Sequence, residues 1–503
     1  MERRSYWIPG SYAPALSEKC NSFLRLLKNK GFTVFTITRR HTACPSREAM
    51  RQTVAPPVPR HRHDITAAWL TRTLRSTGVI APGTWVRTCQ QHPVVTVSAT
   101  GAARDDGGGL SGPQLVRLQL TYEGGAGPAQ MVAKFGNWED KQHMPAWPWK
   151  IRLLQVVGNL RLEEQFRSEI LFYQDVHPHL QGLRLPRVYH VAMTDAPPAR
   201  AWSYVLFDTR TPLRFCVLME DLAVDGFAAV PLGSSLPFPR AKQALINIAQ
   251  LHAFGWQQPR LWTQLHLRPT PWLTFLRADE GIQRRQRDKF VRTNFIPTFL
   301  HRWARHPSQP AHARGRSILQ EPETVAMLTA LNVSFVTWAD EAAQTARLAP
   351  QTIVHGDFHG GNHLFHPNNA CRVIDFQFFG TGRVADEVAY FFTMSVDPAP
   401  EAEEELLSLY HHALVEAGVH GYPYAQFLHE YHVSTLTLLL GNLVRATTFL
   451  TPSAYDQLAQ NRKQAELLHV GDLGRARMMR RAVSWYHTPA LRHTFFSVDR
   501  ACP

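Results

Sequence analysis

The apolar residues of this 503-residue chain follow two patterns: short runs bounded by turn residues, and longer stretches in which apolar residues recur every three or four positions. The short runs predict strands at residues 115–120, 130–135, 215–222, 352–354, 363–365 and 371–374. The periodic stretches predict helices at residues 241–256, 286–304, 322–346, 384–394, 402–417, 424–449 and 453–468. We therefore expect a protein that mixes strands and helices and has no internal repeat.

An early helix signal stands at residues 63–70, where Asp64 and Thr66 are both candidates for the N-cap. Residues 1–62, which precede it, hold 12 Lys and Arg against three acidic residues and so contribute +9 to the net charge of +14. We expect this segment to be a basic, disordered N-terminal extension. An organelle-targeting segment and a wrong start of the coding sequence stay open as alternatives. The remainder is only mildly basic, and no nucleic-acid partner is expected, although a nucleic-acid-binding arm is a further, lesser alternative for residues 1–62.

The stretch HGDFHGGNHLFHPNNACRVIDFQ at residues 355–377 places Asn362 five residues after Asp357, and Asp375 thirteen residues after Asn362. Mg²⁺ takes hard oxygen ligands, usually one or two from the protein, while phosphates and waters complete the octahedron. Asp375, at the end of an apolar strand, can supply a carboxylate, and Asn362 can supply an amide oxygen. Asp357 is then available to orient an acceptor hydroxyl and take its proton. The spacing predicts a phosphoryl-transfer site.

The histidines of the same stretch permit another interpretation. On a strand, His355, Asp357 and His359 would face one way, and together with His363 and His366 they could hold a transition metal in a hydrolase. Against this hypothesis, two glycines after His359 indicate a loop, and a zinc site explains neither the amide nor the second carboxylate of the motif.

A phosphoryl-transfer site also needs a cation for the nucleotide phosphates, upstream on a strand. The run Gln-Met-Val-Ala-Lys-Phe at residues 130–135 has Lys134 in a context close to the V-A-I-K pattern. Glu169 follows in a stretch with helical spacing, where an ion pair to Lys134 would hold the amine in place. Glu163 and Glu164 lie in the same stretch, so a solvated acidic face is the alternative for Glu169.

A glycine-rich segment lies between the early helix and this lysine. Gly107, Gly109 and Gly112 fit G-x-G-x-x-G, and a strand follows them, which indicates a strand-loop-strand hairpin and excludes the strand-loop-helix of a dinucleotide fold. The tip of such a hairpin can present backbone N–H groups to phosphates. An ordinary surface loop stays open, because Asp105 and Asp106 would repel phosphate if they pointed inward.

Four segments together give the chain a family resemblance: HGDFHGGN, VIDFQ, GTGRVADEVAYFF and the upstream LMEDL. They resemble the aminoglycoside phosphotransferase and choline kinase superfamily, and within it the ecdysteroid-kinase-like branch, over about residues 63–450. The resemblance implies an α+β, protein-kinase-like two-lobed fold. Its small lobe would hold an antiparallel sheet and one main helix, and its large lobe would be mostly helical. It also implies ATP and Mg²⁺ as cofactors and a small-molecule hydroxyl as acceptor.

The resemblance assigns roles to individual residues. Asp357 becomes the catalytic base, Asn362 and Asp375 the metal ligands, and Asp386 a support of the catalytic loop. The residues expected to bind the nucleotide are Lys134, Glu169, Gly109, Ser111 and Gly112, with Glu220 and Leu222 in the hinge that joins the lobes. The expected domains are the extension at 1–62, a small nucleotide-binding lobe at 63–219 and a large lobe at 220–503 with the acceptor pocket.

Composition limits the location of the protein. No run of 18 apolar residues occurs, so no membrane span is expected. Six widely spread cysteines without C-x-x-C indicate a reducing compartment, and a cytoplasmic location is expected unless the basic N-terminus directs the chain to an organelle.

The sequence thus predicts an ATP- and Mg²⁺-dependent kinase that phosphorylates a hydroxyl of a small organic molecule. A catalytically inactive nucleotide-binding scaffold is the alternative from another class, ahead of the histidine-based hydrolase. The sequence leaves open the acceptor, the choice of ATP over GTP and the oligomeric state.

Overall fold

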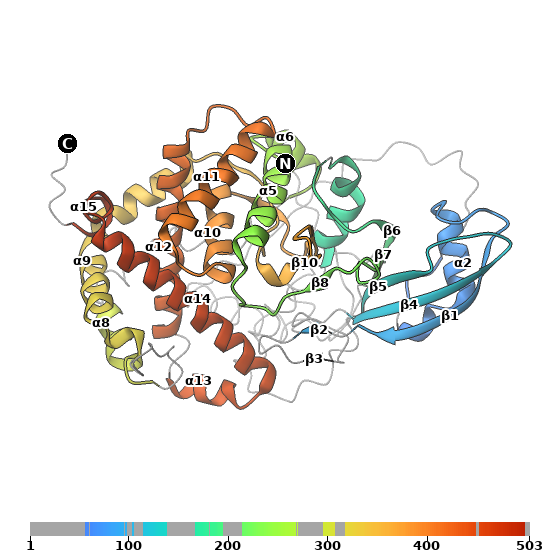
Figure 1. Ribbon diagram of the computed structural model, residues 1–503, viewed down its shortest axis with the longest axis horizontal. Coiled ribbons are helices and arrows are strands. Elements are labelled where there is room, and N and C mark those ends of the chain that lie inside the picture. The colour runs from blue at the N-terminus through green and yellow to red at the C-terminus, as the bar shows by residue number, and fades with distance from the viewer. Residues whose placement is uncertain are drawn as a thin grey trace, which may run out of the picture. The chain divides into compact units, whose positions relative to one another are not determined.

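The computed structural model describes residues 56–59, 61–94, 96–97, 103–104, 114–137, 166–180, 182–194, 214–267, 269, 295–306, 317–448 and 452–497. All of them belong to one unit of the chain, Ala55–Pro503. This unit has the predicted α+β composition, with an antiparallel sheet toward its N-terminal end and a set of helices toward its C-terminal end (Figure 1).

Five antiparallel strands form the main sheet, in the order β1-β4-β5-β7-β6. Strand β5 is central, since it pairs with β4 on one side and with β7 on the other. The strands predicted at 115–120 and 130–135 belong to this sheet, and the strand predicted at 215–222 belongs to it as far as Glu220. The bounds are β1 Trp85–Pro93, β4 Gln114–Glu123, β5 Gln130–Asn137, β6 Val188–Met193 and β7 Arg214–Glu220.

Helix α2, Ala67–Ser76, covers one face of this sheet (Figure 1). Of the two N-cap candidates it is Thr66 that caps α2, because its side chain accepts a hydrogen bond from the Trp69 backbone N–H at 3.1 Å. Successive side chains of β7 point to opposite faces of the sheet, as the pleat of a strand requires. Leu218 joins the apolar cluster under α2, whereas Val217 joins the larger cluster shared with the helices.

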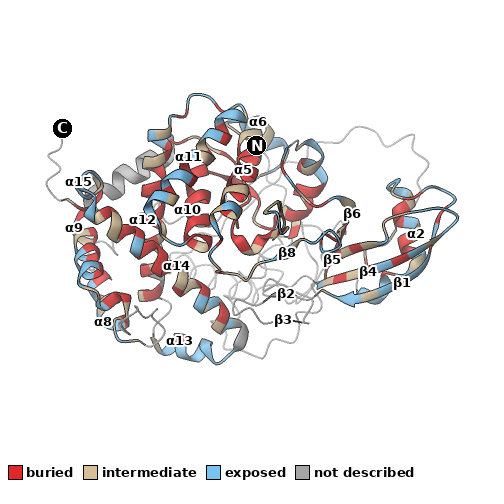
Figure 2. Ribbon diagram, in the orientation of Figure 1, coloured by how far each residue is buried: buried red, intermediate tan, exposed pale blue. Residues whose placement is uncertain are grey.

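The C-terminal helices pack against one another, with α5 against α11 and α10 against both α12 and α14 (Figure 1). Figure 2 shows α10 buried along almost its whole length. The bounds are α5 Phe238–Phe254, α6 Pro259–Gln264, α8 Phe295–Trp303, α9 Pro322–Leu348, α10 Val384–Ser395, α11 Pro400–Glu416, α12 Tyr424–Thr448, α13 Pro452–Ala459, α14 Arg462–His487 and α15 Pro489–Phe496.

One helix prediction was wrong, and residues 286–294 of another, the helix predicted at 286–304, lie outside the described residues. The stretch 453–468, predicted as a single helix, is divided between α13 and α14 at Asn461. The Asn461 side chain accepts a hydrogen bond from the Gln464 backbone N–H at 3.3 Å and so satisfies a donor at the start of α14. Apolar periodicity runs across this break and does not show it, because the cap is a local polar interaction.

Three short strand pairings hold the segment with the polar motif. Strand β9, Thr352–Val354, pairs with β12, Gly380–Gly382. Strand β10, His363–Phe365, lies between β11, Cys371–Val373, and β8, Ala228–Ala229. The predictions at 352–354, 363–365 and 371–374 are confirmed. Single-turn helices lie at Arg62–Asp64, His177–His179, Ile318–Gln320 and Gly360–Asn362. Strand β2, Thr96–Val97, pairs with β3, Ala103–Arg104, in a separate two-stranded sheet.

In the part of the chain that the structure describes, no helix is both long and apolar enough to cross a membrane. The thiols of Cys89, Cys216 and Cys371 are free, two of them buried in strands β7 and β11.

The buried His432 of α12 should make stability depend on pH. Its ring lies 4.6 Å from that of Trp485, and burial, with a small contribution from His429, lowers the pKa of His432 to about 3. The unfolded chain takes up this proton near pH 6.5 and the folded chain does not, so stability is lost as the pH falls below that value. We expect a loss of about 1.4 kcal/mol per pH unit from this residue between about pH 6 and 4.

The comparison is between wild type and His432→Gln, each unfolded in urea at several pH values from 7.5 to 4.5. Other buried histidines also steepen the wild-type curve, so the measured quantity is the difference between the two slopes. Equal slopes would show that His432 takes up its proton in the folded state as readily as in the unfolded chain.

Candidate active site

The polar motif begins where β9 ends and forms a tight loop before β10. Gly356 has φ +83°, and a Cβ atom there would lie 2.1 Å from the Phe378 carbonyl oxygen, so no larger residue fits between His355 and Asp357. The His355 ring is buried. Its Nδ1 accepts the Asp357 backbone N–H at 3.2 Å and its Nε2 donates to the Ile374 carbonyl at 3.0 Å. Burial lowers the pKa of His355, which keeps the ring neutral.

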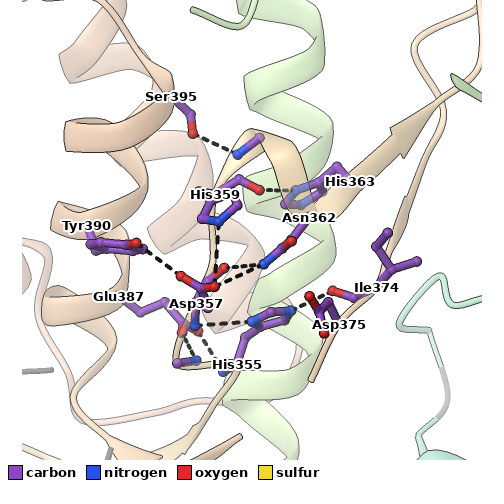
Figure 3. A network of polar contacts seen from close by, with 12 residues as sticks. His355, Asp357, His359, Asn362, His363, Ile374, Asp375, Glu387, Tyr390 and Ser395 are labelled. Carbon is purple, nitrogen blue, oxygen red and sulfur yellow. Dashed lines mark hydrogen bonds and ion pairs between the residues drawn. The ribbon is translucent and has the colours of Figure 1, made fainter. Parts of the chain in front are cut away.

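Glu387 of α10 anchors the start of this loop (Figure 3). Its carboxylate accepts the backbone N–H groups of His355 and Gly356 at 3.0 and 2.6 Å. The same carboxylate lies 2.9 Å from Nε2 of His252, whose Nδ1 lies 2.6 Å from the Tyr410 hydroxyl. A buried chain of polar contacts thus runs from α11 through α5 and α10 into the loop.

The resemblance implied that Asp386 supports the catalytic loop, but the residue that contacts the loop is the neighbouring Glu387. The Asp386 carboxylate binds the Arg383 guanidinium and accepts the Ser434 hydroxyl at 2.7 Å, and neither partner belongs to the loop. Adjacent positions on a helix point about 100° apart, so a one-residue difference decides which carboxylate faces the loop.

Asp357 lies at the centre of the loop (Figure 3). Its Oδ1 accepts the Tyr390 hydroxyl at 3.0 Å, and its Oδ2 lies 3.6 Å from Nε2 of His359. Burial would raise the pKa of Asp357, but the nearby His359 and the hydrogen bonds outweigh it and leave that pKa below its ordinary value. The carboxylate is therefore ionised and held in one orientation, as a group that steers an incoming hydroxyl must be.

Asn362 and Asp375 lie on neighbouring segments. The Ile374 backbone N–H donates to the Asn362 carbonyl at 3.0 Å, which holds the residue before Asp375 beside Asn362. The Asn362 side-chain nitrogen donates to the Asp357 carbonyl at 2.9 Å, so its amide oxygen points to the other side. Asp375 has φ +69°, a left-handed conformation that is uncommon outside glycine and typical of functional sites. One amide oxygen and one carboxylate form a donor set that fits Mg²⁺.

Lys134 of β5 reaches this carboxylate from the sheet. Its Nζ lies 2.7 Å from Asp375 Oδ1 and 2.6 Å from Glu169 Oε1, and Glu169 is buried in the helical residues 166–171. Burial alone would lower the pKa of Lys134, but the two carboxylates raise it, so the amine stays charged. Burial raises the pKa of Glu169 in spite of Lys134, because a single ammonium serves two acids.

A ring stack joins the Glu169 segment to the residue after Asp375. The rings of Phe172 and Phe376 are parallel, with their centroids 3.5 Å apart. Phe172 opens a π-helical turn, Phe172–Val176, directly after the residues that carry Glu169. Because π-helical turns recur at functional sites, and because this stack links residues 204 positions apart, Phe172 and Phe376, it couples the position of Glu169 to that of Asp375.

Five of the predicted site residues come together: Lys134, Glu169 and Asp375 through ion pairs, and Asp357 and Asn362 through the loop. Gly109, Ser111 and Gly112 lie outside the described residues.

The two predicted hinge residues end β7 and open the turn after it. The Glu220 backbone N–H donates to the Arg187 carbonyl at 2.8 Å, and the Glu220 carboxylate accepts the Arg187 backbone N–H at 3.1 Å. The carbonyl of the buried Leu222 accepts the backbone N–H groups of Asp225 and Phe227. Arg117 of β4 forms an ion pair with Asp221 between them.

The histidines of the motif do not converge. Among the described residues, no group of three or more His, Cys, Asp or Glu side chains is placed to hold a metal ion. His363 Nδ1 lies 2.8 Å from the His359 carbonyl, and His366 packs against Phe227. The arrangement gives the hydrolase hypothesis no support.

The sequence analysis did not name Glu387 and Ser395, which accept backbone N–H groups of the loop. It also did not name Tyr390, which donates to Asp357, or His252, which contacts Glu387. Glu387 and Tyr390 lie in the segment GTGRVADEVAYFF, and an acidic residue one turn before an aromatic residue on a buried helix was the signal available there.

Replacing Glu387 by Gln should destabilise the fold by about 1 to 3 kcal/mol. The amide nitrogen would replace one oxygen and face N–H groups that need an acceptor, and a buried donor without a partner costs about 1 to 3 kcal/mol. Urea unfolding at pH 7.5 measures this loss. Glu405→Gln, on the exposed face of α11, is the control and should change stability by less than about 0.5 kcal/mol. An equal decrease in the free energy of unfolding of Glu387→Gln and Glu405→Gln would show that the Glu387 contacts do not stabilise the fold.

The antiparallel sheet that carries Lys134, the helices and the polar loop form the α+β fold that the resemblance implied. Residues 157–420 match the ecdysteroid kinase-like family, and the chain belongs to this family, which confirms the branch that the resemblance named.

Solved structures with a similar arrangement have low sequence identity to this chain. A spectinomycin phosphotransferase in complex with ADP and spectinomycin is 11% identical over 82% of this chain and 99% of its own, with a TM-score of 0.31. An ethanolamine kinase of Plasmodium vivax is 11% identical over 84% of this chain and 88% of its own, with a TM-score of 0.33. An ADP-bound aminoglycoside phosphotransferase is 13% identical over 77% and 94%, with a TM-score of 0.31. No curated protein matches the chain in sequence.

Proposed function

We propose that this protein is a small-molecule kinase that transfers the γ-phosphoryl group of ATP to a hydroxyl of an organic acceptor, with Mg²⁺ as cofactor. The observation that carries the proposal is the convergence of Lys134 from the sheet with Asp375 from the motif, at 2.7 Å, on segments 241 residues apart. Membership of the ecdysteroid kinase-like family supports the same reaction class.

Each residue has a role that follows from its surroundings. Lys134, charged and fixed by Glu169, would bind the nucleotide phosphates. Asn362 and Asp375 would hold Mg²⁺, which neutralises charge on the phosphates when it is bound. Asp357 would accept a hydrogen bond from the acceptor hydroxyl and take its proton as the oxygen bonds to phosphorus.

The remaining nucleotide contacts are proposed from the sequence. Gly109, Ser111 and Gly112 would lie over the phosphates, and the backbones of Glu220 and Leu222 would bind the adenine. The lobes would then comprise residues 63–219 and 220–503, with the acceptor pocket in the second.

Single-turnover ATP consumption tests the proposal. Enzyme in excess over radiolabelled ATP and Mg²⁺ is mixed with pools of small alcohols, and a labelled phosphate ester is sought by chromatography. The expected result is one ester with wild type and none with Asp357→Asn. Nucleotide binding without any ester from a broad panel would favour a scaffold, and stoichiometric zinc in the purified protein would favour the hydrolase.

A further inference from the structure

Helix α14 lies beyond residues 157–420, which match the family, and its inner face is unusually charged for a buried surface. Arg475, Arg477 and Arg481 are each no more than 5% exposed. A buried guanidinium is costly unless its donors are bonded, so the partners of these arginines show what the helix holds in place.

Two of these arginines bind the end of α10 and the residues just after it. Arg477 donates to the Met394 carbonyl at 2.8 Å and to the Asp397 carboxylate at 2.7 Å. Arg481 donates to the Val396 carbonyl at 2.6 Å. Three acceptors within four residues, the carbonyls of Met394 and Val396 and the carboxylate of Asp397, are thus held by one helix, in a fork geometry that a lysine cannot reproduce.

Arg477 also donates a hydrogen bond to a third acceptor, on a segment remote from α10 in the sequence. Its Nη2 donates to the Gly233 carbonyl at 2.9 Å, in the segment between β8 and α5. From the same segment, the Leu236 backbone N–H donates to the Ser395 carbonyl at 2.8 Å. Ser395 is therefore fixed by contacts on both sides of the chain.

Ser395 in turn holds the candidate catalytic loop. Its hydroxyl oxygen accepts the Gly360 backbone N–H at 2.7 Å, and Gly360 lies between Asp357 and Asn362 (Figure 3). Ser395 is 1% exposed, so water does not replace this bond if the serine moves. The loop is then held at its start by Glu387 and at its end by Ser395, both on α10.

We propose that α14 is a positioning element of the active site, in which Arg477 fixes Ser395 and through it the end of the loop that carries Asp357 and Asn362. Arg477 touches no reacting group and acts through Ser395. Its effect on catalysis rests on the proposed kinase function, whereas its effect on the loop does not.

Amide hydrogen exchange followed by mass spectrometry measures the loop without any assay of activity. In Arg477→Ala, exchange should rise at least about 10-fold in peptides that cover residues 355–363 and residues 394–397, because the Gly360 amide loses its fixed acceptor. Arg475→Ala is the matched control. It removes an equally buried guanidinium from the same helix, where Arg475 binds Asp472 at 2.9 Å, three residues before it.

In Arg475→Ala, peptides from the loop should exchange at the wild-type rate, even if the melting temperatures of Arg475→Ala and Arg477→Ala fall by the same amount. Two results overturn the proposal: unchanged loop exchange in Arg477→Ala, or an equal rise in the two variants. Ser395→Ala is a smaller change that tests the Gly360–Ser395 hydrogen bond directly, and it serves when Arg477→Ala does not fold. It should raise the exchange of residues 355–363 and leave that of residues 214–220 in β7 unchanged. Protection of 355–363 in Ser395→Ala also overturns the proposal. These exchange measurements do not depend on catalytic activity, so they test the proposal even if the protein transfers no phosphate.

Discussion

Substitution of Asp357 by Asn is expected to lower the rate of phosphoryl transfer about 10²- to 10⁴-fold, the usual range for removal of a general base. The asparagine keeps the shape of the side chain and one acceptor oxygen. It cannot take the hydroxyl proton, and its NH₂ group would face either the Tyr390 hydroxyl or the His359 ring, both of which now contact a carboxylate. Single-turnover rates with the acceptor found in the alcohol panel give the size of the loss.

The affinity for Mg·ADP distinguishes the loss of the catalytic carboxylate from misfolding of the variant. Asp357→Asn should bind Mg·ADP with an affinity within about threefold of wild type, because Lys134 and Asp375 are unchanged. Asp472→Asn removes a buried carboxylate of α14 that binds Arg475 and the Tyr455 hydroxyl, so it controls for lost stability and should keep the wild-type rate. A variant Asp357→Asn that transfers phosphate at the wild-type rate would remove this carboxylate from the mechanism.

The sequence predicted the groups that would meet the nucleotide, because their chemistry restricts residue type and spacing together. Asp357, Asn362 and Asp375 lie within 19 residues, and short strands fix the distances between them. Lys134 and Glu169 are remote from them but stand in a recognisable strand and helix. The α+β fold followed from the same periodicities, since a pattern of two or of 3.6 residues reports the local backbone directly.

The residues that support the loop could not be predicted in this way. Glu387 and Ser395 of α10 act through hydrogen bonds to backbone N–H groups of the loop, and His252 of α5 acts through Glu387. Any buried polar residue on these two helices could have filled those places. Only the packing of α5, α10 and α14 selects them. The choice of Glu387 over Asp386 depends on the rotation of one helix, and no spacing in the sequence encodes that rotation.

Replacement of Lys134 by Met should weaken both the fold and the binding of Mg·ADP. Glu169 is 1% exposed and would lose its cation, and removal of one partner from a buried pair typically costs about 3 to 5 kcal/mol. Protonation of Glu169 limits this loss. Its folded pKa would lie further above the unfolded value near 4.5, so the variant should regain stability as the pH falls from 8 toward 5.

The double variant Lys134→Met with Glu169→Gln distinguishes the two consequences. With no buried carboxylate left unpaired at position 169, it should recover at least half of the lost stability in urea unfolding and lose the pH dependence that the single variant gains. Affinity for Mg·ADP, measured by calorimetry, should stay about 10- to 100-fold below wild type in both, because a charged hydrogen bond to phosphate is worth about 1.5 to 3 kcal/mol. Binding restored in the double variant would mean that Lys134 serves only to neutralise Glu169. In that case the amine of β5 would be a structural group, and the phosphates would have to find their cation elsewhere.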